Sequence, residues 1–152
     1  MQTLQLTAFG DASDVVELLS LPDPEPGAGE VLVQMEAATI NASDFLLVNG
    51  TYGVRPSLPY RVGGEGVGRV TALGVDVDPG LEGRRVLLLP TYDHGTWATH
   101  VVVAEDAIVP VPDDADPLQV AMIGINPMTA LLLLRDYGAQ EGGPDRVVAQ
   151  NA

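Results

Sequence analysis

The chain of 152 residues contains neither cysteine nor lysine. Without cysteine it cannot form a disulfide, a thiolate zinc site or a thiol nucleophile. Without lysine it has no Schiff-base amine and no P-loop lysine to hold a phosphate. A serine hydrolase is also disfavoured, because neither Ser43 nor Ser57 stands in the G-x-S-x-G setting that exposes a nucleophile. These absences exclude the common covalent mechanisms within this chain.

Basic residues are scarce. The chain carries 7 basic residues, all arginine, against 21 acidic ones, which gives a formal net charge of −14. Because nucleic acids and anionic membranes bind positive surfaces, this charge predicts neither of them as a partner. Apolar runs are short as well, and none approaches the ~18 residues that span a bilayer. The first residues show no basic segment followed by a long apolar one, so we expect a cytoplasmic protein.

Glycine and proline are frequent, at 17 and 12 residues, and they fall between short apolar segments. This spacing is typical of turns between short strands. Residues 30–38 show the pattern best, since Val31, Val33 and Met35 alternate with mostly polar neighbours. The sequence predicts strands at residues 15–21, 30–38, 66–73, 85–89 and 96–103.

Helix signals occur at three places. Residues 41–44 (N-A-S-D) supply capping side chains for a single helical turn over residues 45–48. Residues 113–117, with three aspartates and a proline, predict a helix that begins near Leu118. The Asn126-Pro127 pair ends this helix and opens another over residues 128–137. Many short strands followed by two helices indicate a mainly β chain with a few helices (α+β).

The carboxyl-terminal residues suggest a second structural unit. Residues 146–150 (R-V-V-A-Q) have the pattern of a new buried strand, and the sequence shows no partner for it. We therefore expect one domain over residues 1–137. Residues 138–152 are expected to form a connector and the first strand of a domain that is otherwise missing.

The glycine run at residues 63–68, G-G-E-G-V-G, invites comparison with the G-x-G-x-x-G loop that binds a dinucleotide pyrophosphate. Such a loop must open a helix, whereas residues 69–73 have the pattern of a strand. The run predicts instead a tight bend where two backbone segments pass closely.

Tyr52 lies in the loop sequence N-G-T-Y-G, whose glycines allow the ring to project into a cleft. A phenol stays protonated at neutral pH and can donate a proton or a hydrogen bond to a developing enolate. The alternative is a packing or interface tyrosine, which is the commoner role for a tyrosine in a loop.

Other polar and aromatic side chains are candidates for binding. His94 and His100 flank Trp97, but two histidines without a third ligand do not make a metal site, so we expect no metal. Both histidines are expected to be surface or hydrogen-bonded neutral imidazoles, and Trp97 a core or cleft-wall aromatic. Asn126 and Thr129 belong to a helix start, where backbone donors favour an anion or a carbonyl dipole.

Several segments form an ordered series from about Ala8 to Ala152. They read E-V-L-V, I-N-A-S-D-F, N-G-T-Y-G, G-G-E-G-V-G-R-V, R-R-V-L-L-L, G-T-W-A-T-H and G-I-N-P-M-T-A. The series resembles the amino-terminal catalytic part of the medium-chain dehydrogenase/reductase superfamily. It is most similar to the zinc-free 2-enoyl thioester reductases, the mitochondrial-type enoyl reductases of fatty acid synthesis.

The resemblance implies a GroES-like bent β-barrel. In the family this barrel packs against a Rossmann domain that binds NADPH, and the active site lies between the two domains. Tyr52 matches the family's catalytic tyrosine. Asn41 and Gly64 stand where zinc-dependent relatives carry a cysteine and a histidine ligand, so the resemblance implies that no zinc is bound.

The resemblance also assigns the remaining candidate residues. Asn41, Asn126 and Thr129 match the part of the family that lies at the nicotinamide end of the cofactor. Trp97 matches a segment beside the substrate cleft. A small-molecule substrate, an acyl thioester or a quinone, is implied as the partner, together with a homodimer in the full-length form.

Family members continue beyond Q-N-A into the glycine-rich nucleotide loop, so in this chain the Rossmann domain is expected to be absent or truncated. The resemblance then implies the substrate-side part of an NADPH-dependent reductase for the C=C bond of 2-enoyl thioesters, inactive by itself. Two alternatives remain open. One is a zinc-free quinone oxidoreductase. The other is a non-catalytic GroES-like module in which the apolar helix at residues 128–134 mediates self-association.

Overall fold

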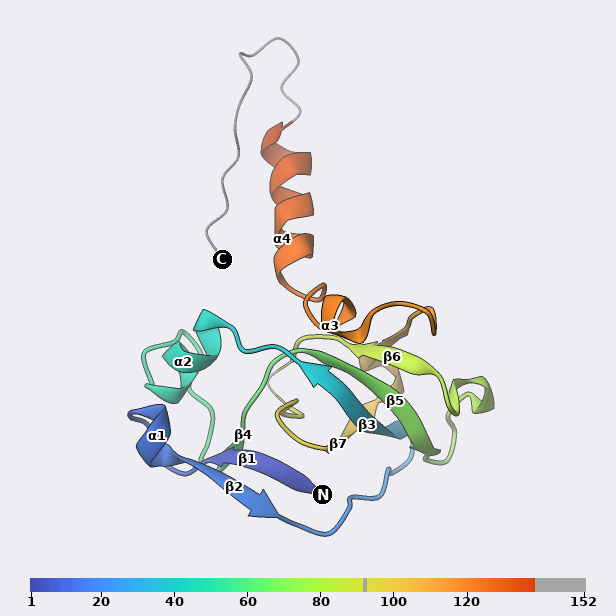
Figure 1. Cartoon of the computed structure of the whole chain (residues 1–152), viewed down its shortest axis with the longest axis horizontal. Helices are drawn as coiled ribbons and strands as arrows, with labels where there is room; N and C mark the ends of the chain where they lie inside the picture. Colours follow the sequence, from blue (N-terminus) through green and yellow to red (C-terminus); the bar gives the residue numbers. More distant parts are fainter. Residues whose placement is uncertain (92, 139–152) are drawn as a thin grey trace.

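The computed structural model describes residues 1–91 and 93–138 and consists mainly of antiparallel strands in two sheets (Figure 1). The larger sheet has the order β7-β3-β5-β6-β8, and the smaller one has the order β2-β1-β4. The strands of the larger sheet are β3 (Glu30–Ala38), β5 (Gly66–Leu73), β6 (Arg85–Leu88), β7 (His100–Ala104) and β8 (Ile108–Pro110). Those of the smaller sheet are β1 (Gln2–Leu6), β2 (Val16–Ser20) and β4 (Tyr60–Arg61).

Residues 96–99 connect the two sheets. The Leu4 N–H donates to the Trp97 carbonyl at 2.9 Å, and an isolated bridge joins Thr3 and Ala98 beside it. On the other side, the Met35 N–H of β3 donates to the Thr99 carbonyl at 3.0 Å. The strands therefore curl into a half-barrel, and the prediction of a mainly β chain with a few helices is confirmed.

Valine and leucine side chains fill the inside of this half-barrel. On β3, Val31 and Val33 are fully buried while Gln34 is exposed, as the predicted alternation requires. The same cluster includes Val70, Val86, Leu88, Val101 and Val103 from the neighbouring strands. Each fully buried side chain of this kind contributes roughly 1.5–3 kcal/mol relative to an exposed one.

Two of the five predicted strands, at residues 30–38 and 66–73, have the predicted bounds, and β6 ends one residue early. The prediction for residues 15–21 is wrong at its start, because Asp11 accepts from the Ser13 N–H at 2.9 Å and caps a short helix α1 (Ala12–Val15). The prediction for residues 96–103 is also wrong at its start, because residues 96–99 connect the sheets before β7 begins. The sequence pattern misses β1 altogether.

A helix forms at each of the three predicted places, but the bounds differ: the first begins at Ala42 and not at residue 45, the second ends at Val120 and not at the Asn126-Pro127 pair, and the third begins at Asn126 and not at residue 128. These helices are α2 (Ala42–Val48), α3 (Pro117–Val120) and α4 (Asn126–Leu133), and a π-helical segment η3 (Leu134–Gly138) continues α4. Asp116 caps α3 by accepting from the Leu118 N–H at 2.9 Å. Two 3-10 turns complete the elements, η1 (Pro79–Leu81) and η2 (Glu105–Ala107). The strand predicted at residues 146–150 lies outside the described residues, and the domain boundary after residue 137 stays a prediction.

The glycine run forms the close backbone passage that its sequence predicts. Gly63 has φ +104°, a conformation that favours glycine. A Cβ at this position would lie 2.5 Å from the Thr96 Oγ1 and 2.7 Å from the Trp97 backbone nitrogen. The chain can therefore pass from β4 to β5 in contact with residues 96–97 only because position 63 has no side chain.

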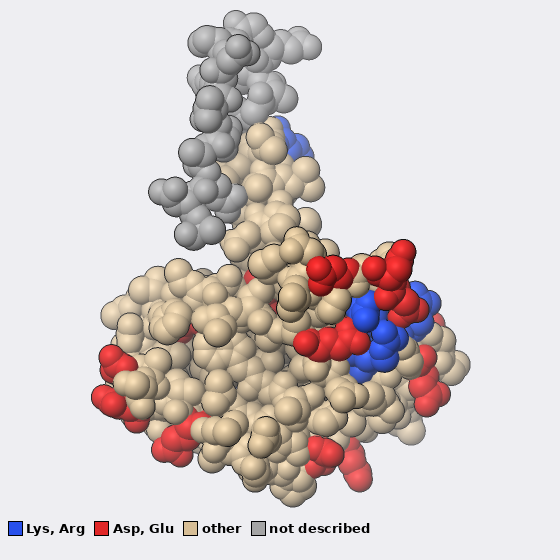
Figure 2. Space-filling view, viewed as in Figure 1, with Lys and Arg blue, Asp and Glu red and all other residues tan. Residues whose placement is uncertain are grey.

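A charged cluster holds the segment after β8 against the large sheet. Arg85 Nε lies 2.6 Å from Glu36 Oε2, and the Arg85 guanidinium also donates to the Ala115 carbonyl at 2.9 Å. Arg69 donates to Asp113 Oδ1 at 3.0 Å. Figure 2 shows a group of basic side chains bordered by acidic ones near this end of the large sheet. Both arginines are thus engaged by carboxylates and carbonyl oxygens of the protein itself.

Helix α4 projects from the half-barrel (Figure 1) and exposes apolar side chains around its circumference. These are Met128, Leu131, Leu132 and Leu134. A helix that is apolar on every face is normally covered by other protein. We expect the purified 152-residue chain to self-associate at micromolar concentration in light scattering. The double variant L131Q/L134Q should scatter as a monomer, whereas a monomeric wild type at the same concentration would contradict the expectation.

Candidate functional site

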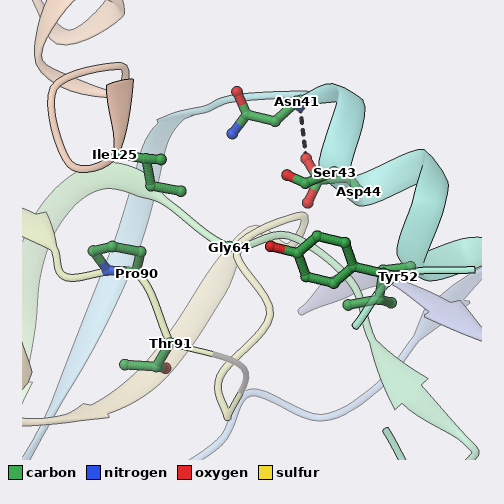
Figure 3. Close-up of a pocket in the computed structure, with 9 residues that line it drawn as sticks. Asn41, Ser43, Asp44, Tyr52, Gly64, Pro90, Thr91 and Ile125 are labelled. Atoms are coloured by element: carbon green, nitrogen blue, oxygen red, sulfur yellow. Dashed lines mark hydrogen bonds between the residues drawn. The ribbon is translucent and has the colours of Figure 1, made fainter. Parts of the chain in front are cut away.

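A pocket of about 120 Å³ opens where α2, the following loop, the glycine run and the start of α4 meet (Figure 3). Its lining comes from separate parts of the sequence. The residues are Asn41, Ser43, Asp44, Leu47, Tyr52, Gly64, Pro90, Thr91 and Ile125. Three of them, Ser43, Tyr52 and Thr91, carry hydroxyl groups, and two others carry an amide and a carboxylate.

Tyr52 is positioned by the turn that ends α2. Its N–H donates to the Leu46 carbonyl at 3.1 Å, and the Thr51 N–H shares that acceptor at 2.9 Å. The ring packs against a buried cluster that includes Leu47 and Val62, and it is half-buried. Its hydroxyl points into the pocket toward Gly64 (Figure 3). The tyrosine therefore has an anchored ring and a hydroxyl that faces the cavity.

Asn41 precedes α2 and connects the helix start to the strands behind it. Its backbone N–H donates to Asp44 Oδ2 at 2.7 Å. Its side-chain Nδ2 donates to Glu65 Oε1 at 2.9 Å and to Thr39 Oγ1 at 3.2 Å. Burial raises the pKa of Asp44, the hydrogen bond from Asn41 opposes this, and the nearby Glu65 adds to the rise. The acidic lining of the pocket is therefore held by the capping interactions of α2.

A second and larger pocket, about 310 Å³, adjoins the first. Asn41 lines both pockets, and Asn126 at the start of α4 lines the second. The other lining residues are mostly apolar: Ala37, Ala38, Thr39, Ile40, Leu118, Ala121 and Met122. Among the described residues, no arginine lines either pocket. Together the two pockets offer a ligand amide and hydroxyl groups, the Asp44 carboxylate and apolar surface, and no arginine of the described residues.

The predicted site residues separate into two groups. Tyr52 and Asn41 lie in the first pocket, and Asn126 lies beside them in the second. Thr129 is exposed one turn further along α4, and its hydroxyl donates to the Ile125 carbonyl at 3.0 Å. Trp97 is half-buried behind the pocket and donates from Nε1 to the Thr39 carbonyl at 2.7 Å. Neither Thr129 nor Trp97 is among the described residues that line the two pockets.

Several residues of the site carry no signal of a pocket in the sequence. Ser43 and Asp44 stand in the predicted cap of α2, which signals a helix start and says nothing of a cavity. Thr91 follows β6 in a loop without a motif, and only the fold brings it to Tyr52. Glu65 lies in the glycine run, and the only sign of a special role in the sequence is that it is the one charged residue among these glycines.

The two histidines differ in environment. His94 is 7% exposed, and its Nδ1 lies 2.8 Å from Thr91 Oγ1. Burial lowers the pKa of His94, against the opposing effect of Asp93. His100 is half-buried, and its Nδ1 lies 3.2 Å from Thr99 Oγ1. Both are hydrogen-bonded imidazoles, and within residues 1–91 and 93–138 no group of three or more potential ligands could hold a metal ion.

Acidification should destabilise the chain through His94. The pKa of His94 in the folded state lies below its value in the unfolded state, which is near 6.5. At pH values above 6.5 the imidazole is neutral in both states, so its titration does not change the free energy of unfolding. Below that pH the unfolded state binds the extra proton, so stability falls until the folded pKa is reached. Urea unfolding at pH 7.5 and 5.5 should show a smaller loss for His94→Gln than for the wild type. The variant His100→Gln keeps His94 and should behave as the wild type; equal losses in all three proteins would contradict the expectation.

The comparison with known families decides the affiliation of the chain. Residues 27–113, more than half of the sequence, match the alcohol dehydrogenase GroES-like domain. The chain belongs to that family. The GroES-like bent β fold expected from the sequence is thereby confirmed, as is the relation to the medium-chain dehydrogenase/reductases. In none of the described helices is there a stretch long and apolar enough to cross a membrane.

Individual relatives of this GroES-like domain are oxidoreductases. The chain is 38% identical over 143 residues to the mitochondrial enoyl-[acyl-carrier-protein] reductase of Homo sapiens, covering 94% of this chain and 38% of that protein. A Bacillus thuringiensis protein named as an NADPH:quinone reductase superposes with a TM-score of 0.81 and is 36% identical in sequence. The match covers 89% of this chain and 40% of that one. The quinone oxidoreductase of Thermus thermophilus superposes with a TM-score of 0.74 and is 31% identical in sequence. This match covers 93% of this chain and 43% of that one. The chain thus spans about two fifths of the length of these relatives.

Proposed function

We propose that this GroES-like domain is the substrate-side part of an NADPH-dependent oxidoreductase that reduces the C=C bond of 2-enoyl thioesters. The observation that carries the proposal is the Tyr52 hydroxyl pointing into a pocket that Asn41 also lines (Figure 3). The 38% sequence identity to an enoyl-[acyl-carrier-protein] reductase, over a match that covers 94% of this chain, supports a thioester as the substrate.

The reaction requires a hydride and a proton. NADPH, when bound, would supply a hydride to the β-carbon, and the electrons of the C=C bond would then place negative charge on the thioester oxygen. A hydrogen bond from the Tyr52 hydroxyl to that oxygen stabilises the developing charge. Protonation of the α-carbon, from the same hydroxyl or from water that it orients, completes the saturated thioester. The bound nicotinamide would supply both electrons of this reduction.

The described residues fit one end of NADPH. Amide groups of Asn41 and Asn126 and the surrounding apolar side chains suit the uncharged nicotinamide. Thr129 is assigned to the same end of the cofactor on the family resemblance alone. The phosphates need cations or a glycine-rich helix start, and neither pocket is lined by an arginine among the described residues. We therefore assign phosphate binding to protein outside these residues. Trp97 supports the site from behind through Thr39, and the chemistry requires no zinc.

The second candidate is a zinc-free quinone oxidoreductase. The structures of Bacillus thuringiensis and Thermus thermophilus proteins named as quinone reductases favour it. A quinone is planar and accepts a hydride directly, so the same pocket could hold it with Tyr52 donating to a carbonyl oxygen. In either case the substrate is a small molecule. The cytoplasmic location and the homodimer of the full-length form also remain proposals.

Parallel turnover measurements decide between the two substrates. NADPH oxidation by the complete enzyme that contains this chain is followed at equal concentrations of trans-2-enoyl-CoA and of 1,4-benzoquinone. We expect kcat/KM for the enoyl thioester to exceed that for the quinone by about tenfold or more, which is a difference of about 1.4 kcal/mol in transition-state stabilisation. A preference for the quinone would reject the thioester assignment, and turnover of neither would reject both.

A further inference from the structure

Glu65 is a fully buried carboxylate directly behind the pocket, with 0% of its surface exposed. One oxygen, Oε1, accepts hydrogen bonds from Asn41 Nδ2 at 2.9 Å and from Thr39 Oγ1 at 3.2 Å. The other, Oε2, is a buried oxygen without a hydrogen-bond partner in the described part of the chain. It lies against Gly124, where a Cβ would come within 2.9 Å of it. Burying a carboxylate with one oxygen unsatisfied is costly, so its presence calls for a reason.

The carboxylate determines which way the Asn41 amide faces. Glu65 Oε1 accepts from Asn41 Nδ2, so the Nδ2 of Asn41, and not its Oδ1, faces Glu65. Thr39 Oγ1 donates to Glu65 and also accepts from Asn41 Nδ2 at 3.2 Å, so the three side chains form a closed hydrogen-bonded group. In Figure 3 the Asn41 nitrogen lies on the side of Gly64 and the oxygen on the opposite side. The amide oxygen is therefore the polar atom of the Asn41 side chain that neither Glu65 nor Thr39 engages, and it lies on the side away from Gly64.

We infer that Glu65 is a positioning residue: it fixes the Asn41 amide so that the cleft presents an acceptor, which selects a ligand group that donates a hydrogen bond. A glutamine at position 65 could offer either a donor or an acceptor, so Asn41 would then adopt both orientations. The inference goes beyond the role of Tyr52. Only its last step, the effect on cofactor binding, rests on the proposed function.

The orientation itself can be tested in the 152-residue chain without any ligand. In ¹⁵N-resolved NMR spectra, the Asn41 side-chain NH₂ should show strongly shifted, slowly exchanging protons because both are hydrogen-bonded. The variant Glu65→Gln should shift this pair and accelerate its exchange. The same substitution at an exposed strand position, Glu17→Gln, is the matched control and should leave the pair unchanged. An Asn41 signal that Glu65→Gln does not alter would overturn the inference.

The functional step is tested by exchanging the two groups. In the double variant N41D/E65Q the glutamine amide donates to the aspartate, which again leaves an oxygen toward the ligand and one negative charge in the pair. For the complete enzyme we expect the KM for NADPH to rise about tenfold in Glu65→Gln and at least as much in Asn41→Asp, where two carboxylates meet. The double variant should recover most of this loss in KM.

The outcomes separate the inference from the proposed function. If the double variant is no better than Asn41→Asp, Glu65 does not act through Asn41 and the inference fails. If the enzyme oxidises no NADPH with any enoyl thioester or quinone, the proposed function fails, and the NMR comparison still decides whether Glu65 orients Asn41.

Discussion

Substitution of Tyr52 by phenylalanine should lower kcat for enoyl thioester reduction by about 100-fold or more, within the range known for a positioned proton donor. The ring would keep its contacts with Leu47 and Val62, so the fold and the binding of NADPH should be retained. Only the hydroxyl that points toward Gly64 would be lost (Figure 3). The measurement is steady-state NADPH oxidation with trans-2-enoyl-CoA by the complete enzyme, together with thermal unfolding of both proteins.

Tyr60 provides the matched control for this experiment. It is also half-buried, and burial, followed by the nearby Asp44 and Asp93, raises its pKa. It does not line the pocket that contains the Tyr52 hydroxyl. Tyr60→Phe should therefore change kcat by less than about threefold. A Tyr52→Phe enzyme as fast as the wild type, or a Tyr60→Phe enzyme equally impaired, would remove Tyr52 from the mechanism.

Substitution of Gly68 by alanine should destabilise the domain by about 3 kcal/mol or prevent folding, as overpacking in a core does. Gly68 of β5 pairs with Met35 of β3, its antiparallel neighbour in the large sheet. A Cβ at position 68 would lie 2.5 Å from Val33 Cγ1 and would clash with the backbone carbonyl of Gln34. Because backbone atoms of a central strand cannot move aside cheaply, the sheet must distort. Urea unfolding followed by circular dichroism measures the loss.

Gly53→Ala is the control for the glycine substitution. A Cβ at position 53 would meet no atom within 4 Å, and its backbone does not have a positive φ. We expect a change of less than about 0.5 kcal/mol, since a surface substitution of this kind removes no contact. If Gly68→Ala were as stable as Gly53→Ala, the close packing of β3 on β5 described above would be wrong.

The parts of the fold that follow from local patterns could be predicted from the sequence. β3 is predicted to the residue because buried valines alternate with polar side chains along the strand. The starts of α3 and α4 follow from Asp116 and Pro127, whose effects on the backbone are local. β1 could not be predicted in this way, because it owes its strand conformation to pairing with β2, β4 and residues 96–99.

The candidate site could be predicted only where a motif marks it. Tyr52 stands out by its glycine-flanked loop and by the family resemblance, and the structure places its hydroxyl at the pocket. Thr91 carries no such mark, since it reaches Tyr52 through the packing of distant segments. Ile125 stands in the G-I-N-P-M-T-A segment of the resemblance, but that segment assigns it no role. Glu65 carried a misleading mark, because the glycines around it suggested a nucleotide loop. Its burial against Asn41 depends on three segments that meet only in the folded chain.

The central proposal is that the nicotinamide end of the cofactor binds at the two adjoining pockets that Asn41 lines, beside the Tyr52 hydroxyl. The most direct test adds reduced nicotinamide mononucleotide, which lacks the adenosine and its phosphates, to the labelled 152-residue chain and follows its NMR spectrum. We expect the Asn41 side-chain amide, the Gly64 N–H and the Tyr52 ring to shift together at millimolar ligand. Shifts confined to another surface, such as residues 102–107 beside His94, or no shifts at all, would contradict the claim.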